Sequence, residues 1–429
     1  MSYLALYLVV FIAVWVLYVR RHKRVAREHA AQLAQSLEAG IVEPPSLHPV
    51  IDPLRCLGSS ACVSACPEQA LGIVAGKAVL VDAAACIGHG ACLAACPVDA
   101  ITLVFGSEKR GVDIPKLTPQ FESNLPGIFI AGELGGMGLI RKAAEQGRQA
   151  IDALRKRARG AHEFDVVIVG CGPAGLSAGL AAIEHKLTYK LIEQEASLGG
   201  AVFHYPRHKI AMTAPVKLAL VGKVKFGEVQ KENLLDFWQK VVAKTGLSIT
   251  FQERMQGIDA ADDGFVVRTD RHAYRTRSVL LALGRRGSPR KLEVPGEETA
   301  KVVYRLADAE QYRGQAVLVV GGGDSALEAA VALAEQPGTT VTLSYRSAGF
   351  SRVKQKNRLA LDAARLAGRV RIELESTVLS IEADKVTLQC KTGPLSLPND
   401  AVIVCAGGQL PTPLLQQIGI QFDTKYGTA

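Results

Sequence analysis

The sequence is poor in aromatic residues and in cysteine, and its first nineteen residues carry no charged side chain. Of its 429 residues, 6% are aromatic and nine are cysteine. So few cysteines exclude a scaffold held together by disulfides. Charged residues make up 21% and hydrophobic residues 48%, which excludes a disordered or collagen-like chain. At roughly 150 residues per domain, the length predicts about three folded units.

The uncharged N-terminal segment is an apolar run from Tyr3 to Val19. With the two residues before it, the run reaches about the minimum length of a membrane-spanning helix. No basic residue precedes it, and five follow it directly: Arg20, Arg21, Lys23, Arg24 and Arg27. By the positive-inside rule we expect a transmembrane helix over residues 1–19, N-out in the inner membrane, with the body of the chain in the cytoplasm. A cleaved signal peptide would instead need a basic segment before a shorter apolar core.

The segment behind this run is polar and rich in alanine. We expect residues 20–45 to form a helical stalk and then a linker at Pro44 and Pro45. The basic cluster accounts for over half of the net charge of +9, so no nucleic-acid partner is expected.

Six of the nine cysteines belong to an internal repeat of thirty residues: Cys56, Cys62 and Cys66, then Cys86, Cys92 and Cys96. Each half reads C-x5-C-x3-C-P. This is the iron-sulfur run C-x2-C-x2-C-x3-C-P with its second cysteine replaced, by Ser59 in one half and by His89 in the other. Disulfides or zinc are weaker explanations, because zinc sites favour C-x2-C pairs and the expected topology leaves this part in a reducing compartment.

Residues 46–105 therefore resemble a bacterial two-cluster ferredoxin domain. In such domains the cysteine before proline reaches across to the other cluster. The resemblance implies one cluster on Cys56, Cys62 and Cys96 and a second on Cys86, Cys92 and Cys66. With three thiolates each, the clusters are either 3Fe-4S centres or, as we prefer, 4Fe-4S centres whose fourth iron is bound by Ser59, His89 or water.

A strand, a glycine turn and a helix begin at Phe164. The apolar strand over residues 164–169 leads into the pattern G-x-G-x-x-G and an alanine-rich helix. Its glycines permit the turn, let the backbone approach a pyrophosphate, and let the helix pack on the strand. The next strand ends at Glu193, where a carboxylate can bind ribose hydroxyls. We expect a dinucleotide site formed by Gly170, Gly172, Pro173, Ala174, Gly175 and Glu193, with Cys171 a small packing residue.

A second unit of this kind begins at Ala316. Its strand is followed by a turn and helix N-terminus with the candidate residues Gly321, Gly323, Asp324 and Ser325. The strand after the helix ends without a carboxylate, and Arg346 and Arg352 follow it. Arginine at this place suits a 2′-phosphate, so NADPH is expected rather than NADH. Alternatively, both arginines are solvated surface charges.

Two such units in one chain resemble the thioredoxin reductase-like flavoproteins, which bind FAD at the first unit and NADPH at the second. The resemblance implies an α/β fold with two Rossmann-like domains, in addition to the small α+β ferredoxin domain. We expect an FAD domain at 160–298, an NAD(P)H domain at 299–398, and a return to the FAD domain at 399–429. The stretch 199–215, which contains Gly200, resembles the flavin-proximal part of these enzymes. The resemblance implies that Tyr205 or Lys209 lies near the flavin. Alternatively, both residues are structural.

The closing segment of such an FAD domain is not found after residue 415, where the family would have it. A similar segment instead precedes the first glycine turn. The sequence NLPGIFIAGE over residues 124–133 resembles the closing segment. We infer a circular permutation in which residues 106–159 belong to the FAD domain. Gly132 and Glu133 would then reach the ribityl and phosphate region of the flavin, although Glu133 replaces the aspartate usual in the family.

Thioredoxin reductases carry a C-x-x-C pair beside the flavin, and this chain has none. Outside the repeat only Cys171, Cys390 and Cys405 remain, far apart in the sequence. We therefore expect NADPH to reduce FAD, and electrons to leave through the two clusters to a partner such as a quinone, cytochrome, ferredoxin or catalytic subunit. The same parts would serve the reverse direction.

Three other functions fit the sequence less well. The chain could be an electron-input subunit like the small subunit of glutamate synthase, a disulfide reductase of the thioredoxin reductase type, or a membrane-held redox sensor. Relatives of this kind are usually dimers, so a homodimer is one expectation.

Overall fold

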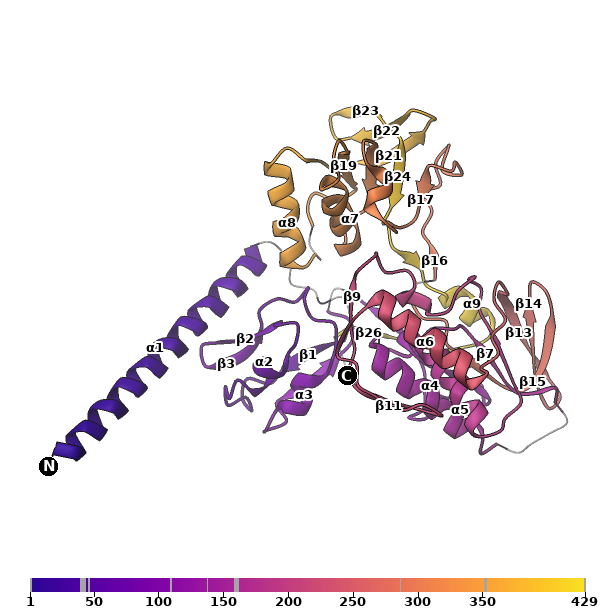
Figure 1. Cartoon of the computed structure of the whole chain (residues 1–429), viewed down its shortest axis with the longest axis horizontal. Helices are drawn as coiled ribbons and strands as arrows, with labels where there is room; N and C mark the ends of the chain where they lie inside the picture. Colours follow the sequence, from indigo (N-terminus) through magenta and orange to yellow (C-terminus); the bar gives the residue numbers. More distant parts are fainter. Residues whose placement is uncertain are drawn as a thin grey trace. The chain divides into compact units, whose positions relative to one another are not determined.

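The computed structural model describes residues 2–38, 44, 47–108, 110–136, 138–157, 162–285, 287–350 and 353–427 (Figure 1). The chain divides into two compact units. The first comprises Met1–Val112, Ala348–Ala363 and Lys425–Ala429, and the second comprises Asp113–Ser347 and Ala364–Thr424.

The cysteine repeat forms a small module of two similar halves in the first unit. Its elements are β1 (His48–Ile51), α2 (Ala61–Ala65), β2 (Leu71–Val74), β3 (Lys77–Leu80), α3 (Ala91–Ala95) and β4 (Ile101–Val104). β1 pairs antiparallel with β4, and β2 pairs antiparallel with β3. Leu71, Ala100 and Ile101 are buried against the cysteines, so the thiols lie within the apolar core of the module.

The N-terminal residues form one helix, α1 (Ser2–Glu38) (Figure 1). Its C-terminal half packs on the cysteine module, where Ile73 N donates to His29 Nδ1 at 3.0 Å and Ser36 Oγ donates to Val81 O at 2.8 Å. The predicted stalk is therefore helical as far as Glu38, but it lies against the module. Most of the predicted linker falls outside the described residues.

The predicted membrane span is wrong. Among the described residues, none of the helices combines the length and apolar character needed to cross a bilayer. The run from Tyr3 to Val19 has 17 residues, fewer than the roughly 20 that a span requires, and α1 continues from it directly into the basic residues. The expectations of a membrane partner, an N-out topology and inner-membrane localisation depended on that span and are withdrawn with it.

The first glycine turn belongs to a six-stranded sheet in the second unit. The strands are β6 (Ile128–Ile130), β7 (Phe164–Val169), β8 (Tyr189–Ile192), β13 (Met255–Ala261), β14 (Gly264–Thr269) and β15 (Ala273–Leu281). Their order is β13-β14-β15-β7-β8, and β6 also pairs with β15, in parallel. β6 comes from the segment that precedes β7 and its glycine turn in the sequence, and it is part of the same sheet.

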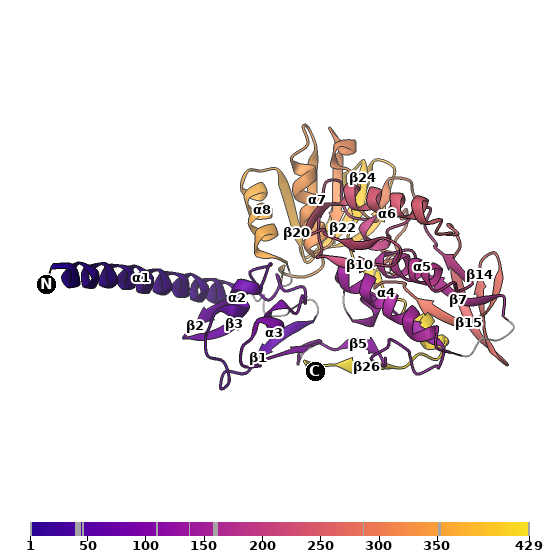
Figure 2. The same ribbon diagram turned by 60° about the horizontal axis from the view of Figure 1, so that its bottom comes forward.

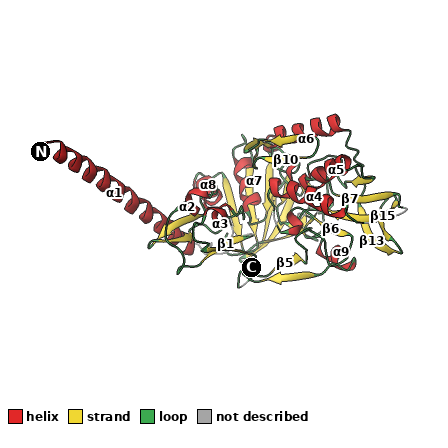
Figure 3. Cartoon of the chain, turned by 90° about the horizontal axis from the view of Figure 1, so that it is seen from below, coloured by secondary structure: helices red, strands yellow, loops and turns green. Residues whose placement is uncertain are grey.

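Both faces of this sheet are covered by packed residues. Successive strand residues point to opposite faces, so neighbouring residues of one strand belong to different clusters. Ile168 and Leu280 pack with α4 (Ile140–Leu154) and α5 (Pro173–Glu184), which lie side by side (Figure 2). Val169 and Leu281 pack on the other face with Leu415 of α9 (Thr412–Gln417) (Figure 3).

The second glycine turn belongs to a five-stranded parallel sheet. Its order is β17 (Val302–Val303), β24 (Ala401–Val404), β18 (Ala316–Val320), β19 (Thr340–Tyr345) and β20 (Val370–Leu374). α7 (Asp324–Ala334) contacts β18 and β19, and an antiparallel sheet of β21 (Thr377–Ile381), β22 (Lys385–Cys390) and β23 (Gly393–Pro398) contacts β19 through β21. α8 spans Gln355–Leu366. The fold is mixed α/β, as the sequence predicts.

The remaining elements are short connections and one helix. They are β5 (Val112–Pro115), β9 (Ile210–Met212), β10 (Val216–Leu218), β11 (Gly222–Val224), β12 (Glu228–Gln230), α6 (Lys231–Thr245), β16 (Ser288–Pro289), β25 (Gly408–Gln409) and β26 (Phe422–Lys425). The described residues also contain 3-10 turns at Glu133–Gly135, Gly200–Val202 and Ala309–Tyr312.

Candidate functional site

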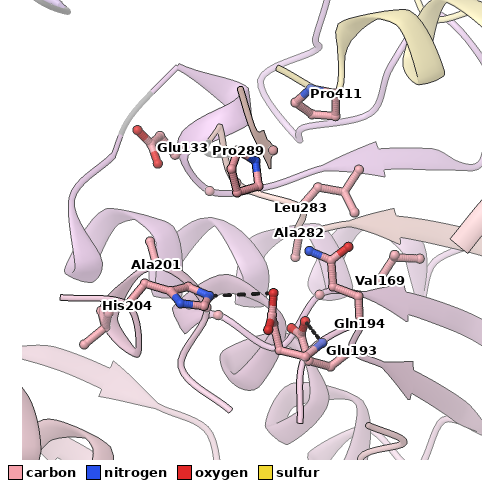
Figure 4. Close-up of a pocket in the computed structure, with 18 of the residues that line it drawn as sticks. Glu133, Val169, Glu193, Gln194, Ala201, His204, Ala282, Leu283, Pro289 and Pro411 are labelled. Carbon is pink, nitrogen blue, oxygen red and sulfur yellow. Dashed lines mark hydrogen bonds and ion pairs between the residues drawn. The ribbon is translucent and has the colours of Figure 1, made fainter. Parts of the chain in front are cut away.

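A cavity of about 1040 Å³ lies at the carboxyl ends of β7 and β8 in the second unit (Figure 4). Its walls come from segments far apart in the sequence: 131–133, 138–143, 169–174, 192–205, 253–255, 282–284, Gly287, Pro289, 302–312 and 409–414. A cavity of this size and place, outside the carboxyl ends of parallel strands, is typical of a nucleotide cofactor site.

The first glycine turn forms one wall of this cavity. Gly170, Gly172, Pro173 and Ala174 line it, and α5 begins there with its N-terminus. Gly175 lies behind the wall, where a Cβ atom would stand only 1.8 Å from Gly170 O. The close packing of helix on strand therefore requires glycine, and it directs free backbone N–H groups of α5 towards the cavity.

Glu193 lies at the end of β8, where the sequence predicts a carboxylate. It lines the cavity and accepts hydrogen bonds from Cys171 N at 2.7 Å and Glu195 N at 3.0 Å. Burial raises the pKa of Glu193. The same burial, together with Glu193, raises the pKa of Cys171, which makes this thiol a poor redox group.

The segment before the glycine turn supplies a second wall. Gly132 and Glu133 line the cavity, and Gly132 N donates to Gln146 Oε1 of α4 at 2.8 Å. Burial raises the pKa of Glu133, and the nearby Arg285 opposes this shift. Both predicted residues are therefore at the cavity, although Glu133 reaches it from a segment that lies before the rest of the site in the sequence.

The stretch 199–215 supplies a third wall and contains a residue that the sequence did not single out. Gly200, His204 and Tyr205 line the cavity. Figure 4 shows the His204 ring directed towards the carboxylates at the end of β8, with Nε2 3.8 Å from Glu195 Oε1. The buried Nδ1 of His204 has no hydrogen-bond partner among the described residues. Buried polar atoms usually have a hydrogen-bond partner, so a bound ligand is a suitable partner for this nitrogen.

Lys209, the other residue considered for the flavin, does not line the cavity. Its Nζ lies 2.9 Å from Glu328 Oε2 on α7. The structure therefore supports a structural role for Lys209, in an ion pair between the two glycine-turn regions of the second unit.

The second glycine turn lies between β18 and α7. Gly323 is the N-cap of α7, which begins at Asp324. A Cβ at Gly322 would come within 2.2 Å of the Tyr345 ring, so this side chain covers the turn. Arg346 is exposed and follows β19 directly, at the same sheet edge as Gly321, Gly323, Asp324 and Ser325. Arg352 lies outside the described residues.

Replacing Arg346 with alanine should raise KM for NADPH by about 10- to 100-fold, because a charge-assisted bond to the 2′-phosphate is worth about 1.5–3 kcal/mol. KM for NADH should stay within about twofold, since NADH has no such phosphate. Steady-state kinetics with both nucleotides measure this. The exposed Arg369, at the opposite end of the sheet before β20, supplies the control R369A. Equal losses with both nucleotides would show that Arg346 does not select the phosphate.

The six repeat cysteines lie close together across the halves of the module. Cys62 is close enough to Cys56 and Cys96 for their charges to affect its pKa, Cys86 is similarly close to Cys66 and Cys92, and Cys92 is close to Cys62 as well. We call Cys56, Cys62 and Cys96 one crossed group and Cys66, Cys86 and Cys92 the other, as the resemblance to ferredoxins implies. Burial raises the pKa of Cys86 to about 11. Backbone N–H groups point at two of the sulfurs: Ala78 N lies 3.4 Å from Cys56 Sγ and Ala100 N lies 3.3 Å from Cys96 Sγ.

This donor set fits iron-sulfur clusters. Thiol groups are the usual ligands, and N–H groups directed at their sulfurs tune the potential. All nine cysteines are free of disulfides. In the part of the chain that the structure describes, no three Cys, His, Asp or Glu side chains stand close enough to hold one metal ion.

The two candidates for a fourth ligand differ. His89 is half-buried and lines a small cavity with Cys66, Cys86 and Cys92. Burial lowers the pKa of His89 and Lys354 lowers it further, whereas Glu68 opposes this shift. Ser59 is exposed. Sequence comparison of the halves could not reveal this difference.

Two family descriptions match the chain. The description "Pyridine nucleotide-disulphide oxidoreductase" matches residues 167–428, and "4Fe-4S dicluster domain" matches residues 48–97.

Individual relatives resemble the flavoprotein part. A ferredoxin–NADP reductase of Pediococcus pentosaceus is 34% identical over 192 residues, 44% of this chain and 55% of the relative. The chain thus spans about half the length of such reductases. Bacilliredoxin reductase Bdr of Bacillus subtilis is 26% identical over 61% of this chain and 82% of the relative. The solved bacillithiol disulfide reductase Bdr of Staphylococcus aureus is 25% identical with a TM-score of 0.53, covering 61% of this chain and 81% of that one.

Proposed function

The chain belongs to the pyridine nucleotide-disulphide oxidoreductase family and is an FAD-dependent NAD(P)H oxidoreductase with a 4Fe-4S domain, and from this premise we propose its electron path. Electrons enter from NADPH at the second glycine turn and leave to a separate redox protein through two clusters on the cysteine module. The proposal is supported by the six module cysteines, which lie close together across its two halves. Among the residues that the structure describes, Cys171 is the one cysteine in the first glycine turn, with no second thiol of a C-x-x-C pair beside it.

The cavity residues would hold FAD. The α5 N-terminus and Gly172 suit the pyrophosphate, Glu193 suits ribose hydroxyls, and Gly132 with Glu133 suits the ribityl and phosphate region. When bound, FAD accepts a hydride from a nicotinamide and releases electrons singly, and iron-sulfur clusters carry single electrons. The protein contributes position and exclusion of water. His204 and Glu195 bring polar groups into the wall next to Ala201 and Val202.

The six cysteines would hold the clusters. Cys56, Cys62 and Cys96 are assigned to one, and Cys66, Cys86 and Cys92 to the other. The N–H groups of Ala78 and Ala100 donate to ligand sulfurs and so favour the more negative, reduced state.

A disulfide reductase is the second candidate, favoured by the similarity to two Bdr proteins. Against it, the cysteines outside the module are single, and burial raises the pKa of both Cys171 and Cys390. Dithiol chemistry needs an accessible thiolate with a neighbouring thiol, which neither residue provides. A role as input subunit of a larger enzyme, or transfer towards NADP, would use the same cofactor sites.

The test uses the purified full chain under anaerobic conditions with NADPH. A one-electron protein acceptor, either a ferredoxin or a cytochrome, should be reduced, and a small disulfide should not. Disulfide reduction that survives replacement of all six module cysteines would contradict the proposal and establish the second candidate.

A further inference from the structure

The two halves of the cysteine module share one backbone path. Gly58 and Gly88 have φ values of +67° and +78°, and the residues two places on, Ser60 and Gly90, have φ values of +62° and +74°. Each pair is followed by a five-residue helix whose C-cap is Cys66 or Cys96. Positions 59 and 89 therefore occupy equivalent places in the two halves. They are also the places at which the complete iron-sulfur run has its second cysteine.

The side chains at these equivalent places have different surroundings. Ser59 is exposed, whereas His89 is half-buried. The cavity that His89 lines is the one lined by Cys66, Cys86 and Cys92, the three members of one crossed group.

The loop that carries His89 is closely packed. A Cβ at Gly88 would lie 2.8 Å from Leu47 O, so the loop passes too close to Leu47 to carry a side chain at this position. Glu68 lines the same cavity, and its Oε2 lies 3.3 Å from Lys354 Nζ. A carboxylate beside an imidazole is the usual outer-shell partner of a metal-binding histidine.

We propose that His89 is the fourth protein ligand of the iron-sulfur cluster held by Cys66, Cys86 and Cys92, and that Ser59 has no such role in the other cluster. This inference rests on the proposed function, because it requires both clusters. One cluster then has three thiolates and one imidazole. Since a neutral imidazole replaces an anionic thiolate, that cluster has the less negative potential expected when histidine replaces cysteine.

The experiment is pulsed EPR of the reduced, full-length protein, labelled at histidine with ¹⁵N. Wild type should show directly bound histidine nitrogen on one of its two cluster signals. S59A should keep this coupling. H89A should lose the nitrogen coupling and part of the iron. H89C should lose the coupling but keep a full cluster, at a more negative midpoint potential.

The outcomes separate the inference from the function on which it rests. Two clusters without histidine coupling in wild type, or coupling that persists in H89C, would overturn the His89 assignment and leave the electron path intact. Wild-type protein without iron or acid-labile sulfide after anaerobic purification would overturn the proposed function itself.

Discussion

Replacing Cys62 and Cys92 together with alanine should lower NADPH-driven reduction of a one-electron acceptor by at least about 100-fold, because each crossed group loses one of its three thiolates. Bleaching of the flavin absorbance by NADPH should stay within about twofold of wild type, since hydride transfer to FAD requires only the nucleotide sites. Stopped-flow absorbance measures the bleaching, and acceptor reduction is followed in the steady state.

A matched control removes a cysteine outside the module. Cys390 is buried in the antiparallel sheet β21-β22-β23, with Sγ 3.9 Å from Glu373 Oε2. C390A should keep both activities. A double variant C62A/C92A that reduces the acceptor at the wild-type rate would show that electrons leave the flavin by another route.

Replacing Gly175 with alanine should abolish FAD retention and lower stability. The new Cβ would stand 1.8 Å from Gly170 O, so either α5 must move from β7 or the glycine turn must open. Overpacking of this kind costs about 1–3 kcal/mol or more, and here the displaced atoms are backbone that lines the cavity. The flavin-to-protein ratio and the thermal midpoint of the purified protein measure the two effects.

Gly227 provides the comparison for Gly175. It lies in the same unit, and a Cβ there would have no atom within 4 Å. G227A should therefore bind FAD at the wild-type ratio. If G175A also retained stoichiometric FAD, the close approach of helix and turn would not be what shapes the cofactor site.

The parts of the site that depend on backbone geometry could be predicted from the sequence. The glycine turn before α5 needs glycine where the helix meets the strand, and Gly175 has no room for a side chain. Glu193 could be placed at the cavity because it follows the next strand, β8, and the parallel strands β7 and β8 end at the same edge of the sheet. The crossed grouping of cysteines is what the repeat and its resemblance to ferredoxins imply, and it stays a prediction; the structure shows that the six cysteines lie close together.

The parts that depend on side-chain surroundings could not be predicted. His204 was one polar residue in a stretch already assigned to the flavin region, and only the structure places its unpaired Nδ1 at the cavity. Ser59 and His89 are equivalent in the repeat, yet one is exposed and the other lines the cysteine cavity. For the N-terminal run, charge pattern and apolar character suggested a span that the structure does not bear out.

Electrons from NADPH should reach the clusters of this chain. This is tested by EPR spectra of the anaerobically purified protein, frozen at intervals after NADPH is added. We expect the cluster signals to change after the flavin absorbance has bleached, with iron and sulfide contents sufficient for two clusters. A fully bleached flavin with cluster signals that stay unchanged at every interval would contradict it.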